Sequence, residues 1–180
     1  MATSQEVTGY WFGHLGPGDW FRKDPALDAD ITERFAAVLA AALRGELYVW
    51  RTSAEGRLAE IIVLDQFSRN IHRDTPGAFA ADPLALILAQ EAIDRGVDRA
   101  LDVSRRAFLY MPFMHSESLS IHDRAVELFA QPGLESQLGF EQRHRGIIER
   151  FGRYPHRNAI LGRESTPEEL AFLEQPGSSF

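Results

Sequence analysis

The first residues that could do chemistry lie in the segment Ile61–Arg73, where an apolar run leads directly into Asp65, Gln66, Arg69 and Asn70. Residues three and four positions apart share one face of a helix, so Asp65 and Arg69 can lie along the same flank. A charged group in apolar surroundings must find a partner, because an unpaired buried charge is costly. These side chains therefore either hold a helical core together or form the floor of a ligand pocket.

The two interpretations assign different roles to the same residues. In the structural one, Asp65 and Arg69 form an intrahelical ion pair, and Asn70 takes the left-handed conformation at the end of the helix. In the functional one, Arg69 or Asn70 faces a cleft. The sequence leaves both open.

A second group follows Pro112, in a short segment that ends with His115, Ser116 and Glu117. Proline removes a backbone donor and is expected to kink or end a helix. This would free His115 and Glu117 to exchange a proton, hold a metal or orient a partner. The metal pattern is incomplete, because no His-x-x-x-His pair supplies further ligands, and we predict neither a metal nor a cofactor. In the structural interpretation, His115 caps or packs against the helix end.

The third group spans residues 144–163 and concentrates five arginines and two histidines in an otherwise acidic chain. His144 shares an apolar stripe with Phe140 and Ile147, so it should point inward. Pro155 would place His156, Arg157 and Asn158 in the first turn of a helix. Free backbone N–H groups there favour an anion, and a guanidinium adds bidentate recognition of carboxylate or phosphate. In the structural interpretation, the arginines pair with acidic residues elsewhere, such as Asp65 and Glu117.

Helical periodicity predicts the elements that position these groups, and start signals mark several of them. Asp24-Pro25 and Asp82-Pro83 each combine a capping residue with proline, while Thr52-x-x-Glu55 and Thr166-x-x-Glu169 are capping boxes. No stretch alternates for long at period two, and the connections are short, so consecutive helices should pack antiparallel. We predict one all-α domain over residues 1–180, built from antiparallel helix pairs. With their caps, the expected helices cover about 5–12, 24–45, 52–67, 82–96, 104–111, 119–129, 140–152, 154–161 and 166–173.

The composition narrows the class of protein. Hydrophobic residues make up 44% of the chain, which suits a folded core, and the net charge of −7 argues against a nucleic-acid-binding surface. There are no cysteines, which excludes disulfides and thiolate catalysis. The start of the chain does not have the pattern of a signal peptide, and no uncharged run approaches the ~20 residues of a membrane span. We expect a cytoplasmic protein that binds neither nucleic acid nor membranes.

Three long motifs resemble a known family. Leu64–Ile71, Phe108–Glu117 and Arg150–Thr166 are similar to the signatures of the uncharacterised bacterial family DUF924, and Tyr10–Gly13 and Glu168–Leu173 resemble it too. The resemblance covers nearly the whole chain. It implies a right-handed array of helices similar to tetratricopeptide-like domains, and it implies no activity, because none is established for the family.

The leading hypothesis is a helical binding module with a groove for an acidic peptide or a small anion. Arg69, Arg150 and Arg157 would form a cationic clamp, and Asn70 and Asn158 would donate hydrogen bonds. The remaining ligand-binding candidates are His144 and His156, and the final residues 177–180 are a candidate occupant of the cluster.

Two other hypotheses stay open. The first is a hydrolase of a small acidic or phosphorylated molecule, in which Asp65, His115 and Glu117 do acid–base work or hold a divalent metal. The second is a homodimer whose polar motifs serve only the fold. The sequence therefore leaves open whether the protein is an enzyme.

Overall fold

The computed structural model describes residues 1–180, which form helices and turns and contain no β-strand. The all-α prediction is confirmed. The contacts within the chain define two compact units, one of Met1–Arg73 and Gly77–Pro112 and the other of Asp74–Pro76 and Phe113–Phe180. None of the helices combines the length and the apolar character needed to cross a membrane. The prediction of one domain over residues 1–180 stays a prediction.

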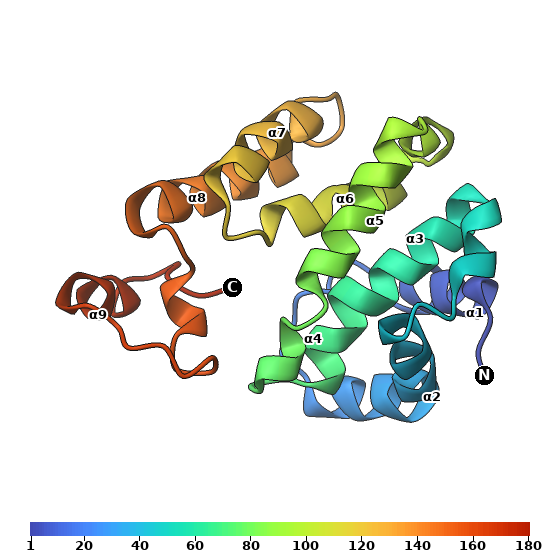
Figure 1. Cartoon of the computed structure of the whole chain (residues 1–180), viewed down its shortest axis with the longest axis horizontal. Coiled ribbons are helices and arrows are strands. Elements are labelled where there is room, and N and C mark those ends of the chain that lie inside the picture. The colour runs from blue at the N-terminus through green and yellow to red at the C-terminus, as the bar shows by residue number, and fades with distance from the viewer. The chain divides into compact units, whose positions relative to one another are not determined.

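The first unit is built around a long helical stretch that contains the Asp65 segment (Figure 1). This stretch comprises α3 (Ala54–Ile62), the π-helix η3 (Val63–Phe67) and α4 (Ser68–Ile71). Helix α1 (Ser4–Gly9) packs on α3, and α2 (Pro25–Leu43) packs on η3 and α4. Helix α5 (Asp82–Asp94) also packs on α3. The remaining helical elements of this part of the chain are η1 (Tyr10–His14), η2 (Tyr48–Thr52), η4 (Pro76–Ala78), η5 (Val97–Ala100) and α6 (Val103–Met114).

An aromatic cluster fills the interior of the first unit. Phe67 is fully buried, and its ring centroid lies 4.6 Å from that of Phe35 and 5.6 Å from that of Trp11. Phe35 comes from α2 and Trp11 from η1, so the cluster joins three elements that are far apart in the sequence. Burial of such large rings supplies much of the driving force for packing. The Asp65 segment is therefore anchored on its apolar side.

The second unit contains a helix hairpin followed by a compact C-terminal segment. Helices α7 (Leu119–Phe129) and α8 (Glu135–Phe151) lie side by side in Figure 1, and their five-residue connection makes them run in opposite directions. Gly152, with φ of 68°, ends α8 in the left-handed conformation that glycine adopts without strain. The short 3₁₀ turn η6 (Pro155–Arg157) and α9 (Pro167–Leu173) follow.

Several predicted helix starts are confirmed and others are wrong. Asp24 caps α2 and Thr166 forms the predicted capping box of α9. The cap of α3 is Ser53 rather than Thr52, because the Ser53 side chain accepts the N–H of Gly56. Asp82 lies inside α5 instead of capping it, and its carboxylate binds Arg69.

Two further sequence predictions on helix ends also need correction. Pro112 lies within α6, which continues to Met114, so proline does not end this helix. The helix predicted from Tyr154 to Leu161 is only the 3₁₀ turn Pro155–Arg157.

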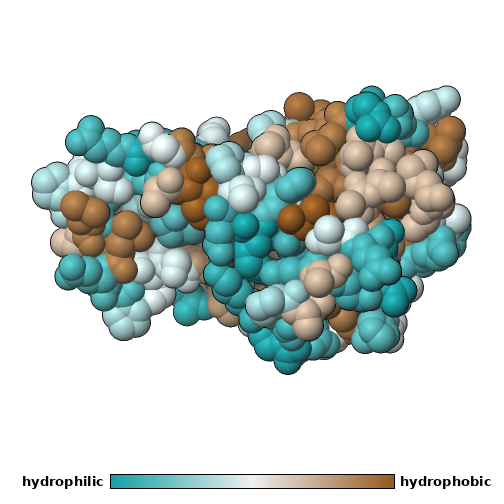
Figure 2. All heavy atoms as spheres, turned by 90° about the horizontal axis from the view of Figure 1, so that it is seen from below, coloured by the Kyte–Doolittle hydropathy of each residue, from teal (hydrophilic) through white to brown (hydrophobic).

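On the face drawn in Figure 2, hydrophobic and hydrophilic residues are intermingled.

Candidate functional site

The charged residues Asp65 and Arg69 of the first unit are engaged with each other and with Asp82. Arg69 donates to both carboxylate oxygens of Asp82, at 2.8 and 3.0 Å, and to the backbone oxygen of Asp65 at 2.7 Å. The Asp65 carboxylate, which is almost fully buried, lies 3.3 Å from the same guanidinium. The intrahelical pair of the structural interpretation is therefore present, with Asp82 as a second partner.

Asn70 is part of a separate contact between helices. Its side-chain amide donates to Asp28 at 2.8 Å, and Asp28 also accepts two hydrogen bonds from Arg73. Asn70 lies within α4, and the only non-glycine residue of the chain with positive φ is Asp74. The expectation that Asn70 ends the helix in the left-handed conformation is wrong, since its amide is held in place by the first turn of α2.

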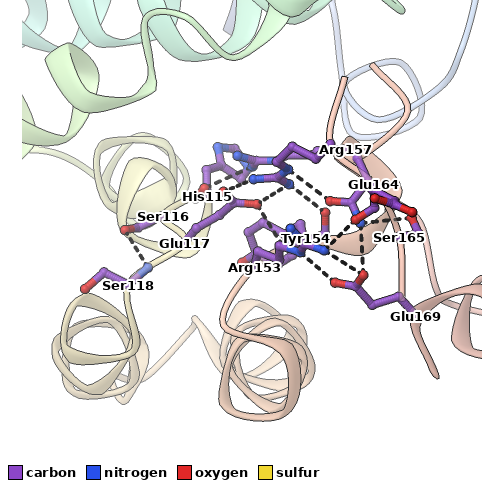
Figure 3. Close-up of polar contacts among 12 residues, drawn as sticks. His115, Ser116, Glu117, Ser118, Arg153, Tyr154, Arg157, Glu164, Ser165 and Glu169 are labelled. Carbon is purple, nitrogen blue, oxygen red and sulfur yellow. Dashed lines mark hydrogen bonds and ion pairs between the residues drawn. The ribbon is translucent and has the colours of Figure 1, made fainter. Parts of the chain in front are cut away.

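The second unit brings together His115, Glu117 and Arg157 (Figure 3). Arg157 is buried, donates to the backbone oxygen of His115 at 2.9 Å, and places its guanidinium carbon 4.7 Å from the centre of the Tyr154 ring. Asp65 belongs to the other unit. The meeting of His115 and Arg157, predicted from sequence, thus takes place within one unit.

Glu117 forms a bidentate ion pair. It accepts two hydrogen bonds from Arg163, at 2.7 and 2.9 Å, and a third from the backbone N–H of Tyr154 at 2.7 Å. Burial raises the pKa of Glu117, but the hydrogen bonds from Arg163 and Tyr154 outweigh it, and the pKa is lowered. A carboxylate with both oxygens engaged and a lowered pKa is suited to holding structure together.

A neighbouring pair joins Arg153 to Glu169, with distances of 2.7 and 2.8 Å (Figure 3). Asn158 is fully buried between the two pairs: its amide donates to Ser165, and its oxygen accepts from Arg163 at 2.9 Å. At the turn where an anion site is predicted, the N–H groups of Arg157 and Asn158 donate to the backbone oxygens of Tyr154 and Pro155. We call the side chains Glu117, Arg153, Asn158, Arg163 and Glu169 the charged network.

Arg150, the remaining arginine of the predicted clamp, lies at the surface. It donates to Glu168 at 3.0 Å and packs over the ring of Phe151. Both members of the Arg150–Glu168 pair are largely exposed. Such surface pairs contribute little, about 0–1 kcal/mol.

Three rings of the second unit form an aromatic cage around Phe180. The ring of Phe180 lies 3.8 Å from His144, 4.6 Å from His156 and 5.2 Å from Tyr154, measured between centroids. We define the aromatic cage as His144, Tyr154 and His156. Tyr154 is fully buried, whereas 54% of Phe180 stays exposed. One face of the Phe180 ring is thus covered by the cage and another faces solvent.

His144 is neutral in this cage. Burial lowers its pKa to about 3. Its Nδ1 lies 2.8 Å from the backbone oxygen of Phe140, and a carbonyl oxygen can only accept, so we assign the proton to Nδ1. Nε2 then carries a lone pair and no charge. The cage therefore presents an uncharged, flat surface to an incoming ring.

The chain reaches the cage through a hydrogen-bonded turn before Phe180. Gly177, with φ of 81°, reverses the chain after α9, and the buried Ser178 donates to the backbone oxygen of Leu173 at 3.0 Å. A side chain would be strained at the φ of Gly177. The position of Phe180 thus follows from contacts of the preceding residues as well as its own.

The family model described as "Bacterial protein of unknown function (DUF924)" matches residues 7–177. The chain belongs to this family. A solved structure of a protein of unknown function from Agrobacterium tumefaciens is 44% identical, with a TM-score of 0.91 over 95% of this chain and 96% of that one. No curated protein matches the sequence. These comparisons confirm the resemblance seen in the motifs and assign no activity to this DUF924 chain.

Two residues of the second unit, Tyr154 and Arg143, are not among the site residues predicted from the sequence. The sequence pattern predicts only that a helix starts at 154, yet the ring, hydroxyl and backbone N–H of Tyr154 all take part in contacts. The sequence pattern does not distinguish Arg143 from the other arginines of this region. Arg143 is exposed, forms no ion pair, and places its guanidinium carbon 4.5 Å from the centre of the Phe140 ring. No three His, Asp or Glu side chains are grouped to hold a metal.

Proposed function

We propose that this DUF924 protein is a helical binding module, and that its second unit holds a peptide segment carrying an aromatic side chain beside an acidic residue. The position of Phe180 carries this proposal. Its side chain occupies the aromatic cage, and more than half of the Phe180 surface remains exposed. An incoming aromatic side chain would take its place. The chain's own residue thus indicates the chemistry that the cage accepts.

The cage suits an aromatic group energetically. Edge-to-face and tilted ring pairs add about 0.5–1.5 kcal/mol each beyond the burial of apolar area. Phe180 makes an edge-to-face contact with Tyr154, at an interplanar angle of 83°, and a tilted contact with His144, at 52°. Since His144 is neutral, no charge has to be desolvated when a ring packs on it. A single side chain would then bind weakly, with a dissociation constant of about 0.1–1 mM.

Arg143 supports the preference for an acidic neighbour. The other arginines of α8 and the following segment are engaged: Arg145 with Asp123, Arg150 with Glu168, Arg157 with the backbone oxygen of His115, and Arg153 and Arg163 within the charged network. Arg143 contacts only the ring of Phe140, four residues before His144. Positions 140, 143 and 144 share one helix face. An unpaired guanidinium on the helix that carries His144 favours a carboxylate next to the bound ring.

The test uses Phe180→Ala, which empties the cage, and an amidated heptapeptide, Glu-Gln-Pro-Gly-Ser-Glu-Phe, which copies residues 174–180 with glutamate in place of Ser179, so that a carboxylate lies next to the ring. Isothermal titration should show binding with a dissociation constant of about 0.1–1 mM. A peptide with alanine in place of phenylalanine should bind at least about tenfold more weakly. Arg143→Gln, introduced into Phe180→Ala, should weaken binding and reduce its dependence on salt.

Phe21→Ala is the matched control, because it removes a phenylalanine that is 69% exposed in the first unit. In this variant the cage stays occupied, so peptide binding should match that of the unmodified protein. Equal affinity of Phe180→Ala for the phenylalanine and alanine peptides would overturn the proposal, and so would the absence of binding to both.

The finer predictions from sequence belong to the same proposal. We propose a right-handed tetratricopeptide-like arrangement, a cytoplasmic location and a peptide partner rather than nucleic acid or membrane. The antiparallel pair α7–α8 and the net charge of −7 support these points. Sedimentation of the purified protein would test the homodimer. The hydrolase gains no support from Glu117, whose oxygens are both engaged by Arg163.

A further inference from the structure

A hollow of about 460 Å³ lies in the first unit, between the N-terminal helical segment and α2. Pockets that hold small molecules commonly measure about 300–1,000 Å³. Glu6 and Gly9 line it from α1, Tyr10 and His14 from η1, and Arg34 and Phe35 from α2. All of these residues belong to the same unit. None of them takes part in the site described above.

Aromatic rings form one wall of the hollow. The centroid of the Tyr10 ring lies 5.2 Å from that of His14 and 5.2 Å from that of Phe35. Tyr10 and His14 are the two ends of the π-helix η1. π-Helices are rare in proteins and occur frequently at functional sites, since their wider turn changes which side chains lie together. The wall can therefore cover one face of a flat ligand.

A cation lies at the hollow with its terminal nitrogens uncommitted. Arg34 donates through Nε to Asp30 at 2.8 Å, and its guanidinium carbon lies 5.5 Å from the centre of the Tyr10 ring. The two terminal nitrogens of Arg34 make no hydrogen bond within the protein. Tyr10 is fixed too, because its hydroxyl donates to Asp30 at 2.6 Å. The two terminal nitrogens of Arg34 are thus held in position to donate to a carboxylate.

An anion lies at the same hollow. One oxygen of Glu6 accepts the N–H and the hydroxyl of Thr3, at 2.7 and 2.9 Å, and the other oxygen accepts no hydrogen bond. The hydrogen bond from the Thr3 backbone lowers the pKa of Glu6, so this carboxylate is ionised at neutral pH. Gly9 leaves space beside it, since a Cβ there would meet no atom within 4 Å.

We propose that this hollow binds a small zwitterion with a flat apolar body, an aromatic α-amino acid being the simplest such molecule. Its ring packs on Tyr10 and His14, its carboxylate pairs with Arg34, and its ammonium group pairs with Glu6. The assignment rests on the coexistence of one cation, one anion and an aromatic wall at a single hollow. It is independent of the peptide proposed for the second unit.

The test titrates the whole protein with phenylalanine and follows backbone amide shifts by NMR. Three probes each lack one group: 3-phenylpropionate the ammonium, 2-phenylethylamine the carboxylate, and glycine the ring. Phenylalanine should shift the amides of residues 6–14 and 34–35 with a dissociation constant of about 10 mM or lower. Each probe should bind about fivefold to tenfold more weakly.

Gly9→Leu fills the hollow while replacing glycine in a helix, so it should abolish binding without lowering the melting temperature. Gly13→Leu is the matched control, because Gly13 is also exposed with open space at its Cβ but does not line the hollow. Glu6→Gln keeps the capping box and should weaken phenylalanine but not 3-phenylpropionate. Arg34→Gln should weaken phenylalanine but not 2-phenylethylamine. Unchanged binding in Gly9→Leu, or no shifts in the unmodified protein, would overturn the proposal.

Discussion

His122 and Glu141 form a fully buried pair, with Nδ1 of the histidine 2.6 Å from Oε1 of the glutamate. Nε2 of His122 lies 2.8 Å from the backbone oxygen of Ser116 and 3.1 Å from the hydroxyl of Tyr154. Because the Ser116 oxygen can only accept, Nε2 carries a proton, and one further proton lies between Nδ1 and Oε1. The pair contacts the aromatic cage through Tyr154, whose hydroxyl lies beside Nε2 of His122.

Replacing Glu141 should separate its hydrogen bond from its charge. Glu141→Gln can still donate to Nδ1 of His122, so we expect a stability within about 1 kcal/mol of the unmodified protein. Glu141→Ala leaves a cavity and an unpaired buried imidazole nitrogen, and should cost about 2–4 kcal/mol. Urea unfolding measures both values. Similar losses in the two variants would show that the hydrogen bond does not stabilise the fold.

The same glutamate should give a defined pH dependence. Burial raises the pKa of Glu141 above its ordinary value of 4.5, although the hydrogen bond from His122 opposes the shift. The folded state then binds this proton more tightly than the unfolded state. Its contribution to stability is fully present below about pH 4.5 and is lost as the pH rises through the raised pKa. Unfolding from pH 4 to 7 should therefore show the unmodified protein losing stability relative to Glu141→Gln, and the opposite slope would contradict the assignment.

Glu169 should behave in the opposite way. The hydrogen bonds from Arg153 are the largest cause that lowers its pKa, to about 2. Its contribution is present above its ordinary pKa of 4.5 and is lost as the pH falls towards 2. Glu169→Gln should lower stability at pH 7 and flatten its acid dependence, because glutamine keeps the capping box but not the charge. Glu168→Gln, at an exposed pair, is the control and should change stability by less than about 0.5 kcal/mol.

Two glycine-to-alanine substitutions should change the free energy of unfolding in opposite directions. A Cβ at Gly56 would lie 2.0 Å from the backbone oxygen of Trp50, so Gly56→Ala forces the start of α3 away from η2. We expect a loss of about 3 kcal/mol. Gly146→Ala lies in the exposed interior of α8 with no atom within 4 Å, and should gain about 0.5–1 kcal/mol. Thermal unfolding compares the two, and a tolerated Gly56→Ala would contradict the close approach.

Local signals in the sequence were sufficient for most of the helices. Asp24-Pro25, the Thr166 capping box and the glycines after α2 and α8 mark ends that depend only on neighbouring residues. One error arose where two adjacent residues could each cap the same helix. Thr52 and Ser53 can both cap, and only the turn of η2 decides that the Ser53 side chain reaches the helix. Asp82 could cap α5 or form an ion pair, and it forms the ion pair because Arg69 lies within hydrogen-bonding distance.

The sequence by itself determined that charged residues must be paired inside a helical protein, because burying a charge alone is too costly. Only the tertiary structure decided the partners, since Glu117 and Arg163 are 46 residues apart and any carboxylate would have satisfied the same requirement. It also decided that Tyr154 and Phe180 meet at the cage. No local sequence pattern specifies which rings come together, because the hydrophobic effect has no preferred direction. The contact depends on how the chain turns at Gly152 and Gly177.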